Sequence, residues 1–241
     1  QMGGSDQWGN IVTGTELIRR RDGGEAWALT TPLIKKADGT KFGKTEGGNV
    51  WLDPKRTSPY DFYQFWINAA DADAGNYIRI FTLKGKEEIE TIEAEHNEDP
   101  GKRVLQKLLA EDITKRVHGT DALNAVIDAT AMFMAKNAPE LIAAANEETF
   151  EKMIAAAGIR RVDLSAEELA SGVRLVEILT TRSAMFDSNG DAMKMMKANG
   201  IAVNKVKATD PKMTLSASQL VGGKYSLVQK GRNDFCVVRV L

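Results

Sequence analysis

Cysteine and histidine are scarce in this sequence of 241 residues, which contains one Cys and two His. The single cysteine, Cys236, excludes a disulfide framework within the chain, and so few Cys and His side chains argue against a protein zinc site. No run approaches ~18 apolar residues, so we expect no transmembrane helix and no membrane partner. The opening residues have no signal-peptide pattern, and we therefore expect a cytoplasmic protein.

Charge of both signs is plentiful but unevenly distributed. Residues 171–241 contain 11 Lys and Arg against 5 Asp and Glu, a net charge of +6, whereas residues 1–170 carry a net charge of −7. A basic C-terminal region on an acidic body suggests a surface that binds a polyanion. Ordinary variation of surface charge is the alternative interpretation.

Two glycine-containing loops carry the residue types expected of a nucleotide site. Residues 1–10, QMGGSDQWGN, lead into a predicted helix, and Asp6 could accept hydrogen bonds from the vicinal hydroxyls of a ribose. Residues 41–45, KFGKT, place two lysines three apart, where they could clamp a polyphosphate. The loop is not a Walker A motif. Taken singly, a helix N-cap and a solvated basic loop explain the two segments equally well.

Hydrophobic periodicity and turn residues predict the elements between and beyond these loops. A short buried strand is expected over 26–34, and Ser58-Pro59 begins the first of four or five helices that extend to about residue 157. Residues 158–170 are expected to form a mobile linker. The elements predicted for the C-terminal part are a helix over 174–181, a helix from Ser188 to Asn199-Gly200, a strand and turn over 201–206, and strands over 225–229 and 235–240.

The two histidines, the cysteine and three methionines are expected to have structural roles. His96 lies in an acidic stretch and is expected to be exposed, whereas His118 precedes Gly119 at a predicted helix end, where a cation would suit the helix dipole. Cys236 is expected to be a buried strand residue. The methionines of the capped helix are expected to fill the core; they are Met193, Met195 and Met196.

Together, the two loops resemble the second half of a class I aminoacyl-tRNA synthetase. KFGKT is similar to the KMSKS signature of that family, with Phe-Gly in place of Met-Ser, and residues 4–7, GSDQ, resemble the G-x-D-Q element of the tyrosyl and tryptophanyl branch. With WLDP at 51–54 and SPYDFYQFWIN at 58–68, the chain resembles the bacterial tyrosyl-tRNA synthetases over its whole length. Its last 70 residues resemble the S-four RNA-binding module, which the tryptophanyl enzymes lack.

The resemblance implies a multidomain fold that combines α/β, α and α+β parts. Residues 1–57 would be the C-terminal end of a Rossmann-like catalytic domain, and residues 58–157 an α-helical anticodon-binding domain. Residues 171–241 would form a small S-four-like RNA-binding domain after the 158–170 linker. The family is homodimeric, and the segment through which it dimerises is expected upstream of Gln1.

The resemblance also implies ATP-dependent activation of L-tyrosine to tyrosyl-adenylate, followed by transfer to tRNA-Tyr. ATP is then a substrate, with Mg²⁺ expected to accompany it. The implied catalytic residues are Lys41, Lys44 and Thr45. Those implied to bind ATP or the adenylate are Gly4, Asp6, Gln7 and Lys44, and those implied on the tyrosine side are Gln1 and Gln7. The side chains implied to contact tRNA are Arg182, Lys194, Lys197, Lys205 and Lys207.

The H-x-G-H element of the family is missing from the sequence, and residue 1 is Gln. We therefore expect a fragment that does not activate tyrosine by itself. Three alternatives remain at this stage: a tryptophanyl-type fragment, a stand-alone RNA-binding protein, and a purely structural helical scaffold.

Overall fold

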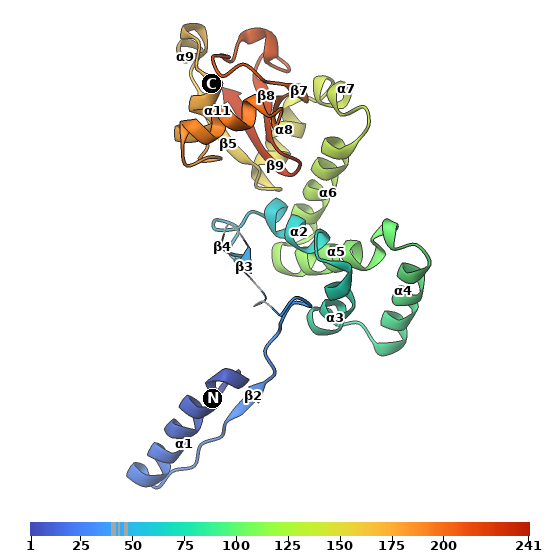
Figure 1. Ribbon diagram of the computed structural model, residues 1–241, viewed down its shortest axis with the longest axis vertical. Coiled ribbons are helices and arrows are strands. Elements are labelled where there is room, and N and C mark those ends of the chain that lie inside the picture. The colour runs from blue at the N-terminus through green and yellow to red at the C-terminus, as the bar shows by residue number, and fades with distance from the viewer. Residues whose placement is uncertain (40–41, 43, 46–47) are drawn as a thin grey trace. The chain divides into compact units, whose positions relative to one another are not determined.

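The chain divides into two units in its computed structural model, Gln1–Val50 and Trp51–Leu241 (Figure 1). The structure describes residues 1–39, 42, 44–45 and 48–241. Both units contain helices and strands, in keeping with the expected mixed α/β class.

A parallel strand pair joined by a helix forms the centre of the first unit. Strand β1 (Met2–Gly4) pairs in parallel with β2 (Leu29–Thr31), and α1 (Trp8–Asp22) connects them. A parallel connection needs a crossover of this length. Further along, β3 (Lys44–Thr45) and β4 (Gly48–Asn49) pair antiparallel.

The strand expected over residues 26–34 is shorter and less buried than the sequence suggested. Only β2 is regular, and Trp27 and Leu29 are 76% and 54% exposed. Within the described residues of this unit, β2 has one strand neighbour, and Ile11 is the one buried side chain of α1. A two-stranded sheet with one helix covers too little surface to bury these apolar side chains.

The second unit begins with a helical bundle. Residues 58–157 contain seven α-helices, α2 (Pro59–Ile67), α3 (Asp71–Phe81), α4 (Lys86–Glu98), α5 (Val104–His118), α6 (Thr120–Met134), α7 (Ala138–Ala143) and α8 (Glu147–Ala155). The expected start of α2 is confirmed, since the Ser58 hydroxyl accepts the Asp61 N–H at 3.1 Å and Pro59 opens the helix. The prediction of four or five helices was wrong because the breaks before α3 and α8 contain neither Gly nor Pro.

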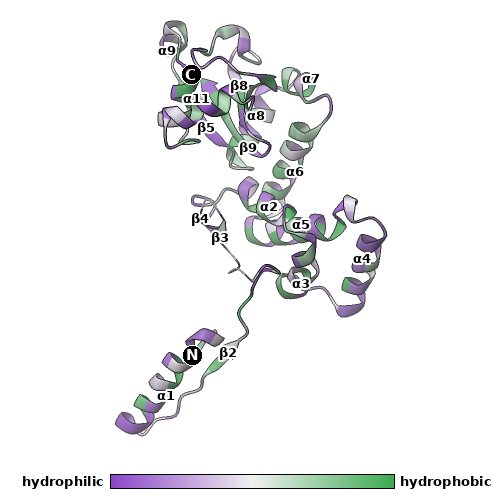
Figure 2. Cartoon of the chain, in the orientation of Figure 1, coloured by the Kyte–Doolittle hydropathy of each residue, from purple (hydrophilic) through white to green (hydrophobic). Residues whose placement is uncertain are grey.

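A five-stranded sheet forms the C-terminal part of the second unit. Its strands are β5 (Arg160–Leu164), β6 (Ile201–Val203), β7 (Val206–Lys207), β8 (Tyr225–Lys230) and β9 (Asp234–Val240), in the order β5-β9-β8-β6-β7. The β5–β9 pair is parallel and the other pairs are antiparallel. Several residues of β8 and β9 are apolar and buried (Figure 2 colours the chain by hydropathy), and the buried Cys236 confirms its predicted place.

Helices cover this sheet and complete its core. They are α9 (Ala166–Ser171), α10 (Leu175–Glu177), a π-helical turn (Ile178–Arg182) and α11 (Asn189–Lys197). The predicted cap at Ser188 is present, because its hydroxyl accepts the Asp191 N–H at 3.1 Å. Met196 is fully buried and Met193 and Met195 pack against the same core, as predicted.

Residues 158–170 do not form the expected unstructured linker. They contain β5, the beginning of α9 and Gly158, which adopts a φ of +68°. Strand β5 has no local signal in the sequence, because its hydrogen-bonding partner β9 lies 76 residues away.

Aromatic rings and an ionic cluster connect the helical bundle to the C-terminal sheet. Phe133 of α6 stacks on Phe235 of β9 with ring centroids 4.0 Å apart, and Tyr60 of α2 meets both rings edge-on. Phe150 of α8 stacks on Tyr225 of β8 at 4.8 Å. These contacts bind the two parts of the unit directly to one another.

An ionic cluster around Glu151 of α8 reinforces this junction. The Glu151 carboxylate accepts a hydrogen bond from the Tyr225 hydroxyl at 2.7 Å and one from Arg239 at 3.0 Å. Arg239 also pairs with Asp163 of β5, and its side chain is only 19% exposed. These hydrogen bonds hold the pKa of Glu151 below its usual value.

The prediction for His96 was wrong, and that for His118 was right only in placing it at the end of a helix. His96 is 5% exposed on the inner face of α4, not on an exposed surface. His118 does end α5, but its ring packs edge-on against Phe62 at 4.8 Å, and burial lowers its pKa. A lowered pKa disfavours the imidazolium that would have suited the helix dipole.

Candidate nucleotide loop and RNA-binding face

The turn between β1 and α1 exposes a carboxylate beside a glycine that two other side chains approach closely. A Cβ atom at Gly4 would lie 2.8 Å from both Leu33 Cδ2 and Asp6 Oδ1, closer than real Cβ contacts. Asp6 follows in a single 3₁₀ turn (Ser5–Gln7) and is exposed. Neither this turn nor α1 has a side-chain cap, so Asp6 does not serve as an ordinary N-cap. Its carboxylate is free to accept hydrogen bonds from a ligand.

The two glutamines predicted for the tyrosine side flank this turn. Gln1 uses its carbonyl to accept the Leu29 N–H at 3.0 Å, which extends the β1–β2 pairing. Gln7 accepts a hydrogen bond from the Asn10 side chain at 3.3 Å. Both side chains are exposed, so both remain available to a ligand.

The KFGKT loop is only partly within the described residues. Lys41 lies outside them. Lys44 and Thr45 form β3, where their backbones pair with Asn49 and Gly48. A two-residue antiparallel pairing fixes the direction of the backbone at these two positions.

On the C-terminal face, Lys194 and Lys197 are the most open of the predicted RNA contacts. They lie three residues apart on α11, and both are exposed. Lys194 has Asp191 at 3.7 Å, an exposed pair of the kind that contributes little. Lys207 is also exposed, and its ammonium donates to the Asn199 carbonyl at 2.8 Å, just beyond the end of α11.

Arg182 differs from these lysines because two carboxylates already bind it. It pairs with Glu168 at 2.8 Å and with Glu177 at 3.0 Å, and these hydrogen bonds raise the pKa of its guanidinium. An RNA phosphate would have to compete with both partners.

Lys205 is half-buried above aromatic rings. Asn204 and Lys205 both have positive φ and form the tight turn between β6 and β7. The turn places the Lys205 ammonium 4.7 Å from the centroid of Phe235 and 5.6 Å from that of Phe133. Desolvation, with a smaller effect of Lys207, lowers the pKa of Lys205 to about 8. The sequence could not reveal this environment, because the rings come from α6 and β9.

Sequence reasoning also missed a polar cavity where the helical bundle meets the sheet. The cavity has a volume of about 290 Å³ and contains charged groups of both signs, from Lys55, Arg56, Asp61, Arg160 and Asp234. Asp61 is accessible to solvent, yet protein atoms crowd its carboxylate, and this desolvation raises its pKa against the opposing effect of the Ser58 hydroxyl. Arg160 pairs with Asp234 at 3.0 Å. Only the fold brings these residues together.

Among residues 1–39, 42, 44–45 and 48–241, no group of three or more His, Cys, Asp or Glu is arranged to hold a metal ion. No helix in the described part of the chain is long and apolar enough to cross a membrane.

Comparisons with known proteins cover both units. Residues 1–135 match the family model described as tRNA synthetases class I (W and Y), and residues 151–238 match the model of the Tyrosine--tRNA ligase SYY-like C-terminal domain. Proteins named Tyrosine--tRNA ligase from Bacteroides fragilis and Porphyromonas gingivalis are 47% and 48% identical over 99% and 100% of this chain.

The chain spans about half the length of these curated relatives, 55% in both cases. A crystal structure of a C-terminally truncated Coccidioides posadasii mitochondrial tyrosyl-tRNA synthetase aligns with 54% of this chain and 38% of its own, at 32% identity and a TM-score of 0.45. Because the first family model alone matches more than half of the residues, the chain belongs to the class I tRNA synthetases of the tryptophan and tyrosine group.

Proposed function

We propose that the polypeptide containing this chain is a tyrosine–tRNA ligase, which activates L-tyrosine with ATP and transfers it to tRNA-Tyr. The observation that carries the proposal is the match of residues 151–238 to a C-terminal domain described for tyrosine–tRNA ligases, on a chain whose residues 1–135 match the tryptophan and tyrosine group. The names of the relatives support the same substrate.

In the first step, a carboxylate oxygen of tyrosine attacks the α-phosphorus of ATP, and the bond to pyrophosphate breaks. No protein nucleophile is required, so the residues act by positioning and by stabilising charge. Asp6 would accept hydrogen bonds from the ribose hydroxyls, and the bare backbone at Gly4 would let the nucleotide approach. Gln1 and Gln7 would lie toward the tyrosine and the α-phosphate.

The two lysines of the KFGKT loop would act on the leaving group. Lys41 and Lys44 would neutralise the charge that develops on pyrophosphate, and Thr45 would help to hold the loop. Any Mg²⁺ would arrive with ATP as part of the substrate. In the second step, a terminal ribose hydroxyl of the tRNA attacks the tyrosyl carbonyl and displaces AMP.

The C-terminal sheet with α11 would be the RNA-binding module, of the S-four type. The exposed Lys194 and Lys197 are its best phosphate contacts, with Lys207 beside them. Arg182 and Lys205 would contribute by supporting the module, because carboxylates or rings already engage them. The helical bundle would meet the anticodon region. We further propose a cytoplasmic location and a homodimer built through a segment outside this chain.

Amino-acid-dependent exchange of pyrophosphate into ATP tests the proposal, with the full-length polypeptide and with tyrosine, tryptophan and phenylalanine compared. We expect exchange with tyrosine alone. Exchange with tryptophan would assign the protein to the other branch of the group. Absence of exchange with every amino acid, combined with retained tRNA binding, would make it an RNA-binding protein and overturn the proposal.

A further inference from the structure

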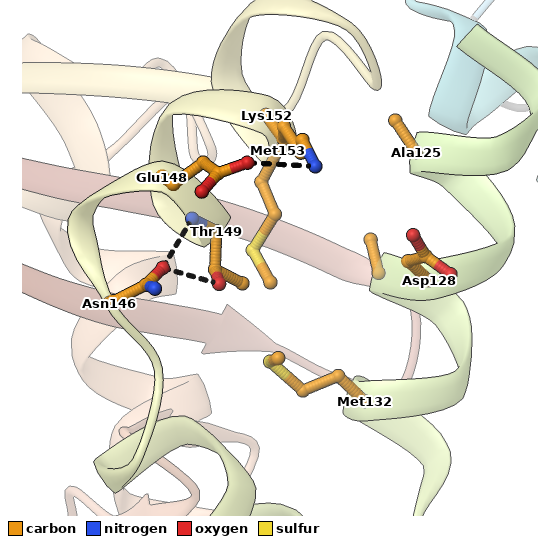
Figure 3. A pocket seen from close by; sticks show the side chains of 9 residues that line it. Ala125, Asp128, Met132, Asn146, Glu148, Thr149, Lys152 and Met153 are labelled. Atoms are coloured by element: carbon orange, nitrogen blue, oxygen red, sulfur yellow. Dashed lines mark hydrogen bonds and ion pairs between the residues drawn. The ribbon is translucent and has the colours of Figure 1, made fainter. Parts of the chain in front are cut away.

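A cleft between α6 and α8 has no role in the function proposed above. Ala125, Asp128, Ala129 and Met132 line it from α6, spaced so that they share one helix face. Residues of α8 and the residue preceding it form the opposite wall, and they are Asn146, Glu148, Thr149, Lys152 and Met153. Figure 3 shows the side chains of the two helices on either side of the space, which we call the α6–α8 cleft.

Short and flexible side chains make the floor of this cleft apolar. Ala125 and Ala129 lie one turn apart and are 8% and 1% exposed, so between Asp128 and Met132 the α6 wall offers only methyl groups to the space. Met153 is buried at 4% exposure, and Met132 is half-buried across from it. Thioether side chains adapt readily to an aliphatic ligand.

Charged groups surround this floor, and the negative charges outnumber the positive ones. Lys152 pairs with Glu148 at 3.1 Å (Figure 3). Asp128, on the opposite wall, has no hydrogen bond or ion pair with any residue that the structure describes, so the cleft keeps one uncompensated carboxylate. The Asn146 side-chain oxygen is occupied by Thr149, at 2.9 Å from both its N–H and its hydroxyl. An apolar floor beneath a free carboxylate suits a cation on an aliphatic chain.

The volume of the cleft limits the size of that ligand. It measures about 250 Å³, room for about eight water molecules at ~30 Å³ each, and therefore for a ligand of about eight non-hydrogen atoms. The fully exposed lining residues are all polar or charged, and Met132 is only half-buried, so the rim offers little apolar surface to a partner polypeptide. A small free ligand fits better than the side chain of a docked protein.

We propose that the α6–α8 cleft binds a short free aliphatic amine, with its ammonium at Asp128 and its carbon chain between Met132 and Met153. A ligand of this size is expected to bind with a Kd of about 1 mM. Binding of the amine would require neither tyrosine nor tRNA.

Methyl NMR of the complete 241-residue chain, labelled at its methionine methyl groups, provides the test. We expect titration with n-butylammonium or 1,4-diaminobutane to give saturable shifts of the Met132 and Met153 methyls and none of Met185, which is buried in the distant sheet core. 1-Butanol matches the chain length without the charge, and it should bind at least tenfold more weakly. Equal binding of butanol and butylammonium would overturn the assignment to an amine.

Two variants with matched controls locate the site. Asp128→Asn keeps the shape but removes the charge, and it should weaken butylammonium at least tenfold, whereas Asp121→Asn, exposed on the first turn of the same helix, should not. Ala129→Met should fill the cleft and abolish binding, whereas Ala131→Met, on the exposed face of α6, should not. Binding that survives both Asp128→Asn and Ala129→Met would refute the site.

A lysine derivative tests whether the cleft binds a free amine or the lysine side chain of a polypeptide. Nα-acetyl-lysine methylamide presents the same aliphatic ammonium from a bulky peptide-like group that exceeds the volume of the cleft, so we expect it to bind more weakly than 1,4-diaminobutane. Tighter binding of the lysine derivative would overturn the proposal of a free amine and indicate a polypeptide ligand.

Discussion

Gly158 should be the position of the junction least tolerant of a side chain. Its φ of +68° lies in the left-handed region, where an L-residue costs about 1–2 kcal/mol. A Cβ atom there would also lie 2.9 Å from Pro59 Cδ and 3.0 Å from Ser58 Cβ, at the first turn of α2. Overpacking of this kind costs about 1–3 kcal/mol. Gly158→Ala should therefore lower the free energy of unfolding by about 2–5 kcal/mol.

Gly222 provides the matched control, because its φ of +60° is similar but a Cβ atom there would have no neighbour within 4 Å. Gly222→Ala should lose only the conformational part, about 1–2 kcal/mol. The free energy of unfolding of both variants is measured by urea titration, with circular dichroism and tryptophan fluorescence as the two probes. Coincident transitions of the two probes justify a two-state analysis. Equal losses for Gly158→Ala and Gly222→Ala would refute the argument that α2 packs against this glycine.

Three further predictions concern lysines. In the full-length polypeptide, Lys44→Ala should slow tyrosine activation by roughly 10²–10³-fold with little change in ground-state ATP affinity. The control Lys35→Ala should leave the activation rate unchanged. Equal losses in rate and in ATP affinity in pre-steady-state assays would contradict a role of Lys44 confined to the transition state. Lys194→Ala should weaken tRNA binding and reduce its salt slope by about 0.7–0.9, and an unchanged slope in filter binding would show that this lysine meets no phosphate. Because the folded pKa of Lys205 is lowered from 10.5 to about 8, the unfolded chain binds more protons between these values, so stability should rise as pH increases from 8 to 10.5. Urea titrations across that range should show a smaller rise for Lys205→Met than for Lys212→Met.

Local signals in the sequence identified the elements that depend on local interactions. Ser58-Pro59 marked the start of α2, Ser188 marked that of α11, and alternation over residues 201–206 predicted the strand β6 and the turn after it. These succeed because caps, turns and side-chain alternation operate within a few residues. Strand β5 was missed because its hydrogen bonds come from β9, far along the chain.

The candidate sites show the same division between local and distant information. The two lysines on one face of α11, Lys194 and Lys197, could be predicted from their three-residue spacing alone. The pairing of Arg182 with Glu168 and the burial of Lys205 over Phe133 depend on residues brought together by the fold. A lysine in a turn is ordinarily assigned to solvent, and only the packing of α6 against the hairpin changes that assignment.

The position of β9 between β5 and β8 determines the order in which that sheet can be made. Strand β5 is synthesised first, but its partner follows 76 residues later, which at 5–20 residues per second is a delay of roughly 4–15 s. During that time β5 is an unpaired strand, and such strands recruit foreign chains. Arg160 and Arg161 precede Val162, and Asp163 separates Val162 from Leu164, so charged side chains flank the apolar ones and should keep the waiting strand soluble.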